Sequence, residues 1–186
     1  MQALEKTKEE VTNKAVTMSD FLRIEYLELC TENIKDLEVL RYCYEELAKL
    51  YEKWVMYSEA LKYLAKLNSL TISKNDKFKI FEKEIEILIK SGNYDNVLSY
   101  YKEIVKITNT IKEYELKRKI VELFKMEANK LESGKKYSSL SRLYEKLIPF
   151  LADIEKKDIM KRLLTTYEKL GKVREFLELE KSIERY

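Results

Sequence analysis

The chain has 186 residues, and its 36 lysines and arginines are almost balanced by 33 aspartates and glutamates, for a formal net charge of +3. Hydrophobic residues make up 45% of it and charged residues 37%, a balance typical of a globular domain and not of a disordered chain. With three glycines and one proline it lacks the turn residues that a sheet of hairpins needs, which favours an all-helical protein. No apolar run approaches the ~20 residues of a membrane-spanning helix.

Apolar residues recur at helical spacing along the chain, and turn residues divide them into ten predicted helices. Asp36 is expected to cap the third helix, and Ser91-Gly92-Asn93 to end the fifth and begin the sixth. The apolar stripes predict helices over about residues 4–17, 21–31, 57–70, 93–107, 111–132, 137–148 and 173–186. The third helix opens at Asp36 and the fifth at Asn75-Asp76, and the ninth is marked by Met160, Leu163, Leu164, Tyr167 and Leu170 and ended by Gly171.

One pattern of small, apolar and tyrosine residues recurs through these helices. Its aligned positions Ala60, Val97, Leu140 and Phe176 are 37, 43 and 36 residues apart. A period of this size with two helices per unit is typical of an α-solenoid. The sequence therefore predicts a right-handed α-α superhelix of about five antiparallel helix pairs. We expect a single domain over 1–186, with its clearest units at about 36–70, 75–107, 111–150 and 153–186, and helices 3–32 as a cap or degenerate unit.

The units resemble the tetratricopeptide repeat. The match is closest for Leu47-Ala48-x2-Tyr51 with Tyr57-x-Glu59-Ala60-Leu61, and for Gly92-Asn93-Tyr94-x2-Val97-x3-Tyr101. The resemblance implies a protein-binding solenoid whose first helix in each pair lines a concave face. Two departures stand out: Val55 occupies the place of a glycine, and Gly134-Lys135-Lys136-Tyr137 reads as a turn one residue longer than Gly92-Asn93-Tyr94.

A second similarity concerns the lengthened, irregular units. The stretch from Tyr57 to Ile104 is similar to the helical repeats of PCI-type subunits of the proteasome lid and the signalosome. The winged-helix module that completes such subunits is absent from this sequence, as no strand signals follow.

The residue types argue against catalysis. The chain has no histidine, which removes the commonest general base and zinc ligand. Its glycines stand about 40 residues apart, too far to form a phosphate-binding loop. Two cysteines, Cys30 and Cys43, cannot supply the four ligands of a zinc site. Each is interpreted as a buried apolar residue, and the sequence indicates no resolving thiol for either. We therefore expect no enzyme activity, no cofactor and no metal site.

Nucleic-acid binding is also disfavoured. Lys117-Arg118-Lys119 and Lys156-Lys157 are basic clusters, but acidic residues interleave with lysine almost everywhere else. Such mixed runs are typical of solvated helix faces stabilised by ion pairs one turn apart. An RNA-binding adaptor remains the third hypothesis for function.

Protein recognition is the first hypothesis, by analogy with the concave helix positions of tetratricopeptide arrays. Mapped onto this chain, the candidate partner-binding residues are Tyr42, Glu45, Lys49, Glu52, Lys79, Glu82, Glu86 and Ile89. Because Glu45, Glu82 and Glu86 would repel the acidic tail that Hsp70/Hsp90-binding repeats hold, we expect a mixed-charge or basic partner, in the form of a peptide, a helix or a partner subunit.

The alternative is a structural subunit of a larger complex, of the PCI or vesicle-fusion-adaptor kind. The last predicted helix carries Phe176, Leu177, Leu179 and Ile183 on one side. If its own hairpin partner does not cover this face, it invites a homodimer or a neighbouring subunit. A lysine-rich chain with two cysteines and no signal-peptide core is expected to be cytoplasmic, with reduced thiols.

Overall fold

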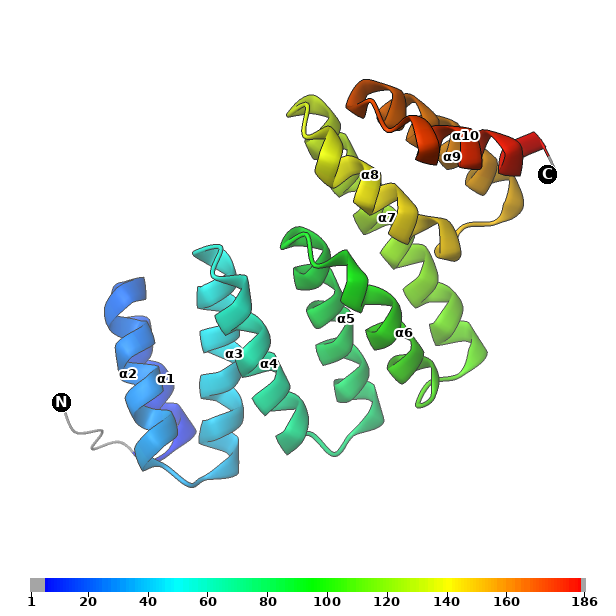
Figure 1. Ribbon diagram of the computed structural model, residues 1–186. Helices are drawn as coiled ribbons and strands as arrows, with labels where there is room; N and C mark the ends of the chain where they lie inside the picture. The colour runs from blue at the N-terminus through cyan, green and yellow to red at the C-terminus, as the bar shows by residue number, and fades with distance from the viewer. Residues whose placement is uncertain (1–5, 185–186) are drawn as a thin grey trace. The chain divides into compact units, whose positions relative to one another are not determined.

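The computed structural model describes residues 6–184, which form ten α-helices and two short 3₁₀ helices and contain no strand (Figure 1). The elements in chain order are α1 (Lys8–Val16), α2 (Asp20–Asn33), α3 (Leu37–Lys53), α4 (Tyr57–Leu70), α5 (Lys74–Lys90), η1 (Tyr94–Asn96), α6 (Val97–Val105), α7 (Thr110–Ser133), α8 (Tyr137–Leu147), η2 (Ile148–Phe150), α9 (Asp153–Leu170) and α10 (Val173–Glu184). The predicted class, an all-α chain of about ten helices in hairpins, is confirmed. The predicted extensions of the first helix to residue 4 and of the last to residue 186 lie outside the described residues.

The chain divides into two compact units, one ending at Ile87 and the other beginning at Leu88, so that the boundary falls within α5. In the first unit α2, α3 and α4 pack side by side in chain order, and α1 lies against both α2 and α3. In the second unit α7, α8, α9 and α10 pack in chain order, and η2 contacts α7, α8 and α9. Each hairpin buries one face of its helices and leaves the other to solvent, as amphipathic helices require.

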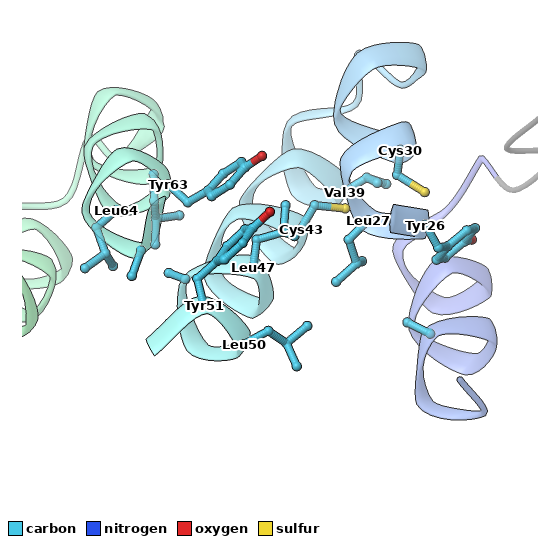
Figure 2. Close-up of a cluster of buried hydrophobic side chains, with 14 of the residues drawn as sticks. Tyr26, Leu27, Cys30, Val39, Cys43, Leu47, Leu50, Tyr51, Tyr63 and Leu64 are labelled. Carbon is cyan, nitrogen blue, oxygen red and sulfur yellow. The ribbon is translucent and has the colours of Figure 1, made fainter. Parts of the chain in front are cut away.

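The core of the first unit centres on α3, whose Val39, Cys43 and Leu47 are fully buried at intervals of four residues (Figure 2). This spacing places the three side chains on one face of the helix, where they meet α2. Tyr51 of α3 and Tyr63 of α4 stack with ring centroids 5.6 Å apart. Stacking of this kind fills the gap between neighbouring helices.

A carboxylate on α2 ties these two tyrosines together. Glu28 Oε1 accepts a hydrogen bond from the Tyr51 hydroxyl at 2.8 Å and another from the Tyr63 hydroxyl at 2.7 Å. Burial, and then these bonds to Glu28, raise the pKa of both phenols well above the ordinary value. Hydrogen bonds to a charged acceptor are about twice as strong as neutral ones, so Glu28 links α2, α3 and α4 through buried polar groups.

The core of the second unit is aromatic. Phe124 of α7 is fully buried, and its ring lies 5.8 Å from that of Tyr94 and 6.2 Å from that of Phe150. Tyr101 meets Phe150 edge to face at 5.3 Å. These rings join η1, α6, α7 and η2 in one cluster.

The same backbone turn ends α3, α5, α7 and α9. In each, one residue adopts a left-handed conformation: Val55 (φ 61°), Gly92 (75°), Lys135 (54°) and Gly171 (67°). The amide that follows it donates to a carbonyl five residues earlier, as Met56 does to Tyr51 and Lys136 does to Leu131. This is the Schellman pattern of a helix end. The four residues are 37, 43 and 36 positions apart, the period predicted from the side chains.

The turn corrects one expectation from the sequence. Lys135, not Gly134, is the left-handed residue of the third turn, because Gly134 has φ −81°. The third turn therefore has the same length as the turn at Gly92, and the prediction of an extra residue there was wrong. Glycine is preferred in this conformation but is not required. Aligning the turns by their glycines therefore placed the third unit one residue out of register.

Helix starts agree with the sequence in most cases. Asp36 Oδ1 accepts from the backbone amides of Glu38 and Val39, as expected of a cap. The fifth helix begins one residue before its predicted start, with Ser73 Oγ accepting from the amide of Asp76 at 3.4 Å. The sixth helix opens with the 3₁₀ turn η1, and Asn93, expected as a cap, makes no side-chain capping bond there.

Candidate binding groove of the first unit

A groove of about 560 Å³ lies in the first unit, between α1, α3, α4 and the part of α5 up to Ile87. Its volume is in the range of sites that hold a ligand or an anchoring group of a partner. It is lined by Lys8, Glu38, Arg41, Tyr42, Glu45, Ala48, Lys49, Leu64, Leu67, Thr71, Asp76, Lys79, Ile80, Lys83 and Ile87.

The floor of the groove is apolar. It is made by Ala48 of α3, Leu64 and Leu67 of α4, and Ile80 and Ile87 of α5. All five side chains are buried, with at most 8% of each exposed. Ala48 is the smallest of the five and belongs to the core of the first unit.

The rim of the groove is charged and has more cations than anions. Lys8, Arg41, Lys49, Lys79 and Lys83 stand against Glu38, Glu45 and Asp76. Two of these cations are already paired. Lys49 lies 2.9 Å from Glu45 and 2.9 Å from Glu46, and Lys83 lies 2.8 Å from Glu52 and 3.2 Å from Glu86. Burial alone would lower the pKa of Lys49, but its two carboxylates outweigh that effect and raise it.

The remaining rim charges are committed to no ion pair within residues 6–184. Among the cations these are Lys8, Arg41 and Lys79, and among the anions Glu38 and Asp76. Glu38 and Asp76 each lie in the first turn of a helix, where the positive end of the helix dipole offsets part of their charge. The groove therefore offers an apolar floor with charges of both signs above it.

The structure brings four of the eight predicted site residues to this groove, namely Tyr42, Glu45, Lys49 and Lys79. Glu52 and Glu86 do not line it, but both pair with Lys83, which does. Glu82 is half-buried outside it, and Ile89 is buried in the second unit.

The residues predicted on α5 lie on a face of the helix about one residue away from the face that lines the groove. The lining residues of that helix are Asp76, Lys79, Ile80, Lys83 and Ile87, in which the neighbours Lys79 and Ile80 lie between positions three or four residues away on either side. The same spacing could have been read from the sequence, but Lys83 and Glu82 are equally polar and gave no reason to prefer one face. The contribution of α4, through Leu64, Leu67 and Thr71, was missed because the resemblance assigns the concave surface to the first helix of each pair.

Outside the groove, Glu84 and the two cysteines are further buried titratable groups of the first unit whose surroundings the structure defines. Glu84 of α5 is buried, its Oε2 has no hydrogen-bond partner, and burial raises its pKa to about 7. The thiols of Cys30 and Cys43 are both fully buried and meet between α2 and α3 (Figure 2). The hydrogen bond with Cys30, and then burial, raise the pKa of the Cys43 thiol. The sequence predicted burial of both, which is correct, and missed their contact.

Within the described part of the chain, no cluster of three metal-ligating side chains occurs. No helix there has the length and apolarity to cross a membrane.

No family model matches the chain, and no curated protein matches it. Solved structures that are similar to it include a double mutant of MamA, at 13% identity and a TM-score of 0.46, over 98% of this chain and 97% of that one. Others are the TPR-like repeats of a kinesin light chain from Podosopora anserina, at 12% identity and a TM-score of 0.43, over 96% of this chain and 92% of that one. A variant of those repeats is similar at 12% identity and a TM-score of 0.44, over 96% of this chain and 91% of that one. The recurring left-handed turn and the paired helices give the chain the architecture of tetratricopeptide-like helical hairpins.

Proposed function

We propose that the chain is a non-enzymatic interaction scaffold and that the groove of its first unit binds a segment of another protein. The observation that carries the proposal is the combination of an apolar floor with rim charges that have no partner of their own within the described residues. Apolar floors supply the binding energy of most such sites, and a few polar groups supply their specificity.

The charges of the rim support a partner of mixed charge. Arg41 and Lys79 suit acidic side chains, and Glu38 and Asp76 suit basic ones. An amphipathic helix would place apolar side chains every three or four residues along the floor. Because Glu82 and Glu86 lie outside the groove, a purely basic partner is less well matched than the sequence indicated.

A displayed library of random peptides, selected on the full chain, tests the proposal. We expect enriched peptides to combine apolar anchors with both acidic and basic residues. Their binding should fall at least about tenfold on the Arg41→Glu and Lys79→Glu double variant, which corresponds to about 1.4 kcal/mol. Both side chains are exposed and have no ion pair to lose within residues 6–184, so the variant should fold normally.

The matched control is the double variant Lys102→Glu and Lys161→Glu. It makes the same change in net charge at exposed positions of α6 and α9, and it should leave peptide binding unchanged. If no peptide is enriched, or if peptides bind both double variants equally well, the groove is not the binding site.

A second candidate, assembly into a larger complex, has support from α10. None of its described side chains is buried, and Val173 and Leu177 are 67% and 47% exposed. Phe176, Leu179 and Ile183 of the predicted face are half-buried, and the helix packs against α9. Val173 and Leu177 are then the apolar side chains that α10 offers to a neighbouring subunit. Replacing Leu177 with lysine should then abolish co-assembly while leaving peptide binding in the groove intact.

A further inference from the structure

The free charges on the rim of the groove occur in the same order on two helices. Glu38 precedes Arg41 by three residues on α3, and Asp76 precedes Lys79 by three residues on α5. All four line the groove, and none is committed to an ion pair within residues 6–184. Each acidic residue lies in the first turn of its helix, and each cation lies about one turn further on. On each helix an acid and a base are therefore available to a partner, side by side.

The two helices run in the same direction, so their charges form one common order. α4 is antiparallel to α3 on one side and to α5 on the other (Figure 1). Both acidic residues thus lie toward the end of the groove where α3 and α5 begin, and both cations lie nearer its middle. Lys8 of α1 is a third free cation on the rim within residues 6–184. With three cations against two anions the free charges sum to +1, so a partner with one acid more than its bases balances them.

The other half of the groove needs no charge from a partner. Its two cations, Lys49 and Lys83, each lie 2.8–3.2 Å from two carboxylates of this chain. Ala48 of the floor directly precedes Lys49, and Ile87 follows Lys83 by about one turn. This half therefore suits an apolar stretch of the partner, whereas the half with free charges suits an acid and a base.

The spacing of the free charges favours a helix as the occupant. Side chains three or four residues apart on a helix have Cβ atoms about 5–6 Å apart, so a partner helix can repeat the spacing of the rim charges. In an extended strand, neighbouring side chains on one face are about 6.7 Å apart. From Glu38 to Lys49 the groove follows α3 for about 17 Å, the length of about three helical turns.

The partner's own charges then decide its direction. Within a helix, an acid three or four residues before a base is the favourable order, and a base is favourable in the last turn. The base of the partner has to face Glu38 and Asp76, at the end where α3 and α5 begin. A helix meets these conditions together only when it runs antiparallel to α3 and α5, as α4 does.

Given the function proposed above, on which this step rests, we propose that the groove holds the C-terminal turns of an amphipathic helix of another protein, antiparallel to α3 and α5. The sequence of that segment is an apolar stretch, then an acidic residue, then a basic residue three or four positions later. The acid faces Arg41 and Lys79, and the base faces Glu38 and Asp76. The order of the charges thus selects the partner, and the dipole of the partner helix sets its direction.

Three synthetic peptides of about 15 residues and equal composition test the proposal, at a length where a helix is marginally stable. The first ends in the order apolar stretch, glutamate, lysine, the second exchanges the glutamate and the lysine, and the third is the first written backwards. Calorimetric titration into the full chain should show the first binding at least about tenfold more tightly than the second, which places each charge against its like. The first should also bind more tightly than the third.

Equal binding of the first and second peptides, or of the first and third, overturns the proposal and leaves a binding groove in place. If none of the three binds although the displayed library yields binders, the charge order and direction alone are wrong. If the library yields no binder either, the proposed function fails as well.

Exchanging the rim charges should invert the preference. Glu38→Arg with Arg41→Glu reverses the order on α3 at constant net charge, and Asp76→Lys with Lys79→Asp does so on α5. With both exchanges the second peptide should bind more tightly than the first. Either exchange alone should bring the two affinities closer together, and it serves as the test if the fourfold variant loses its helical circular dichroism. An unchanged preference in a folded variant overturns the proposal.

The matched control is Glu103→Lys with Lys106→Glu. It makes the same exchange at the same spacing, at exposed positions of the second unit. The order of affinities of the three peptides should stay as in the wild type. A control that inverts the preference would place the binding site outside the groove and overturn the proposal.

Discussion

At the scale of single residues, we expect Glu84 to contribute to the pH dependence of stability. Burial raises its pKa from 4.5 to about 7, so the folded protein holds this proton more tightly than the unfolded chain does. The contribution of Glu84 to the free energy of unfolding should therefore be fully present below pH 4.5, where the side chain is protonated in both states. It should fall by about 3 kcal/mol as pH rises to 7. Glu84→Gln should remove this fall and stabilise the chain at about pH 8. Urea unfolding across this pH range measures it, with exposed Glu168→Gln as the control.

Glu28 is the second residue with a defined energetic role. Replacing it with leucine would leave the buried hydroxyls of Tyr51 and Tyr63 without their acceptor, at a cost of about 1–3 kcal/mol for each hydroxyl left unsatisfied. Glu28→Gln keeps an acceptor and should cost less. It should also lower the pKa of both phenols while leaving them above the ordinary value, because burial is the larger cause. Phenolate absorbance during alkaline titration gives the second readout. An unchanged titration would mean that Glu28 does not hold these hydroxyls in solution.

At the scale of elements, the recurring turn permits a test of backbone strain. Val55→Gly relieves the crowding of a β-branched residue at φ 61° and should raise the free energy of unfolding by roughly 0.5–1 kcal/mol. Gly171→Ala should do the opposite by about 1 kcal/mol. A Cβ there meets no atom within 4 Å, so that only the conformation opposes it. Thermal and urea unfolding of the two variants should therefore shift in opposite directions. Equal shifts would mean that side-chain contacts, and not φ, dominate at these turns.

At the scale of the whole molecule, the first unit supplies its own probes of opening. Cys30 and Cys43 are fully buried there, and the chain's one tryptophan, Trp54, lies in the same unit. Because the thiolate is the reactive form and the pKa of Cys43 is raised, a disulfide reagent should react only after the helices separate. Thiol exposure and Trp54 fluorescence should share one urea midpoint. If the thiols react well before the fluorescence changes, α2 and α3 open as a smaller unit of their own.

The sequence by itself determined the helices and the period of the chain. Helix α4 runs from Tyr57 to Leu70 as predicted, and Asp36 caps α3 as predicted, because apolar spacing and capping side chains act within a few residues of one another. The period of 37, 43 and 36 residues likewise follows from side chains that each hairpin must bury. Placing Val55 at a glycine position was also correct, since its φ is positive.

Only the tertiary structure decided which faces meet. The groove depends on Leu64 and Leu67 of α4 lying across from Ala48 of α3, and a rotation of α5 by about one residue separates Lys83 from Glu82. The contact of Cys30 with Cys43, the burial of Glu84 and the link between Asp20 and Lys53 join residues that no local pattern connects. Local periodicity defines an apolar stripe to within about one residue, whereas the packing of several helices selects a single rotation of each. The groove depends on that selection, and for this reason the sequence predicted the type of protein more completely than its surfaces.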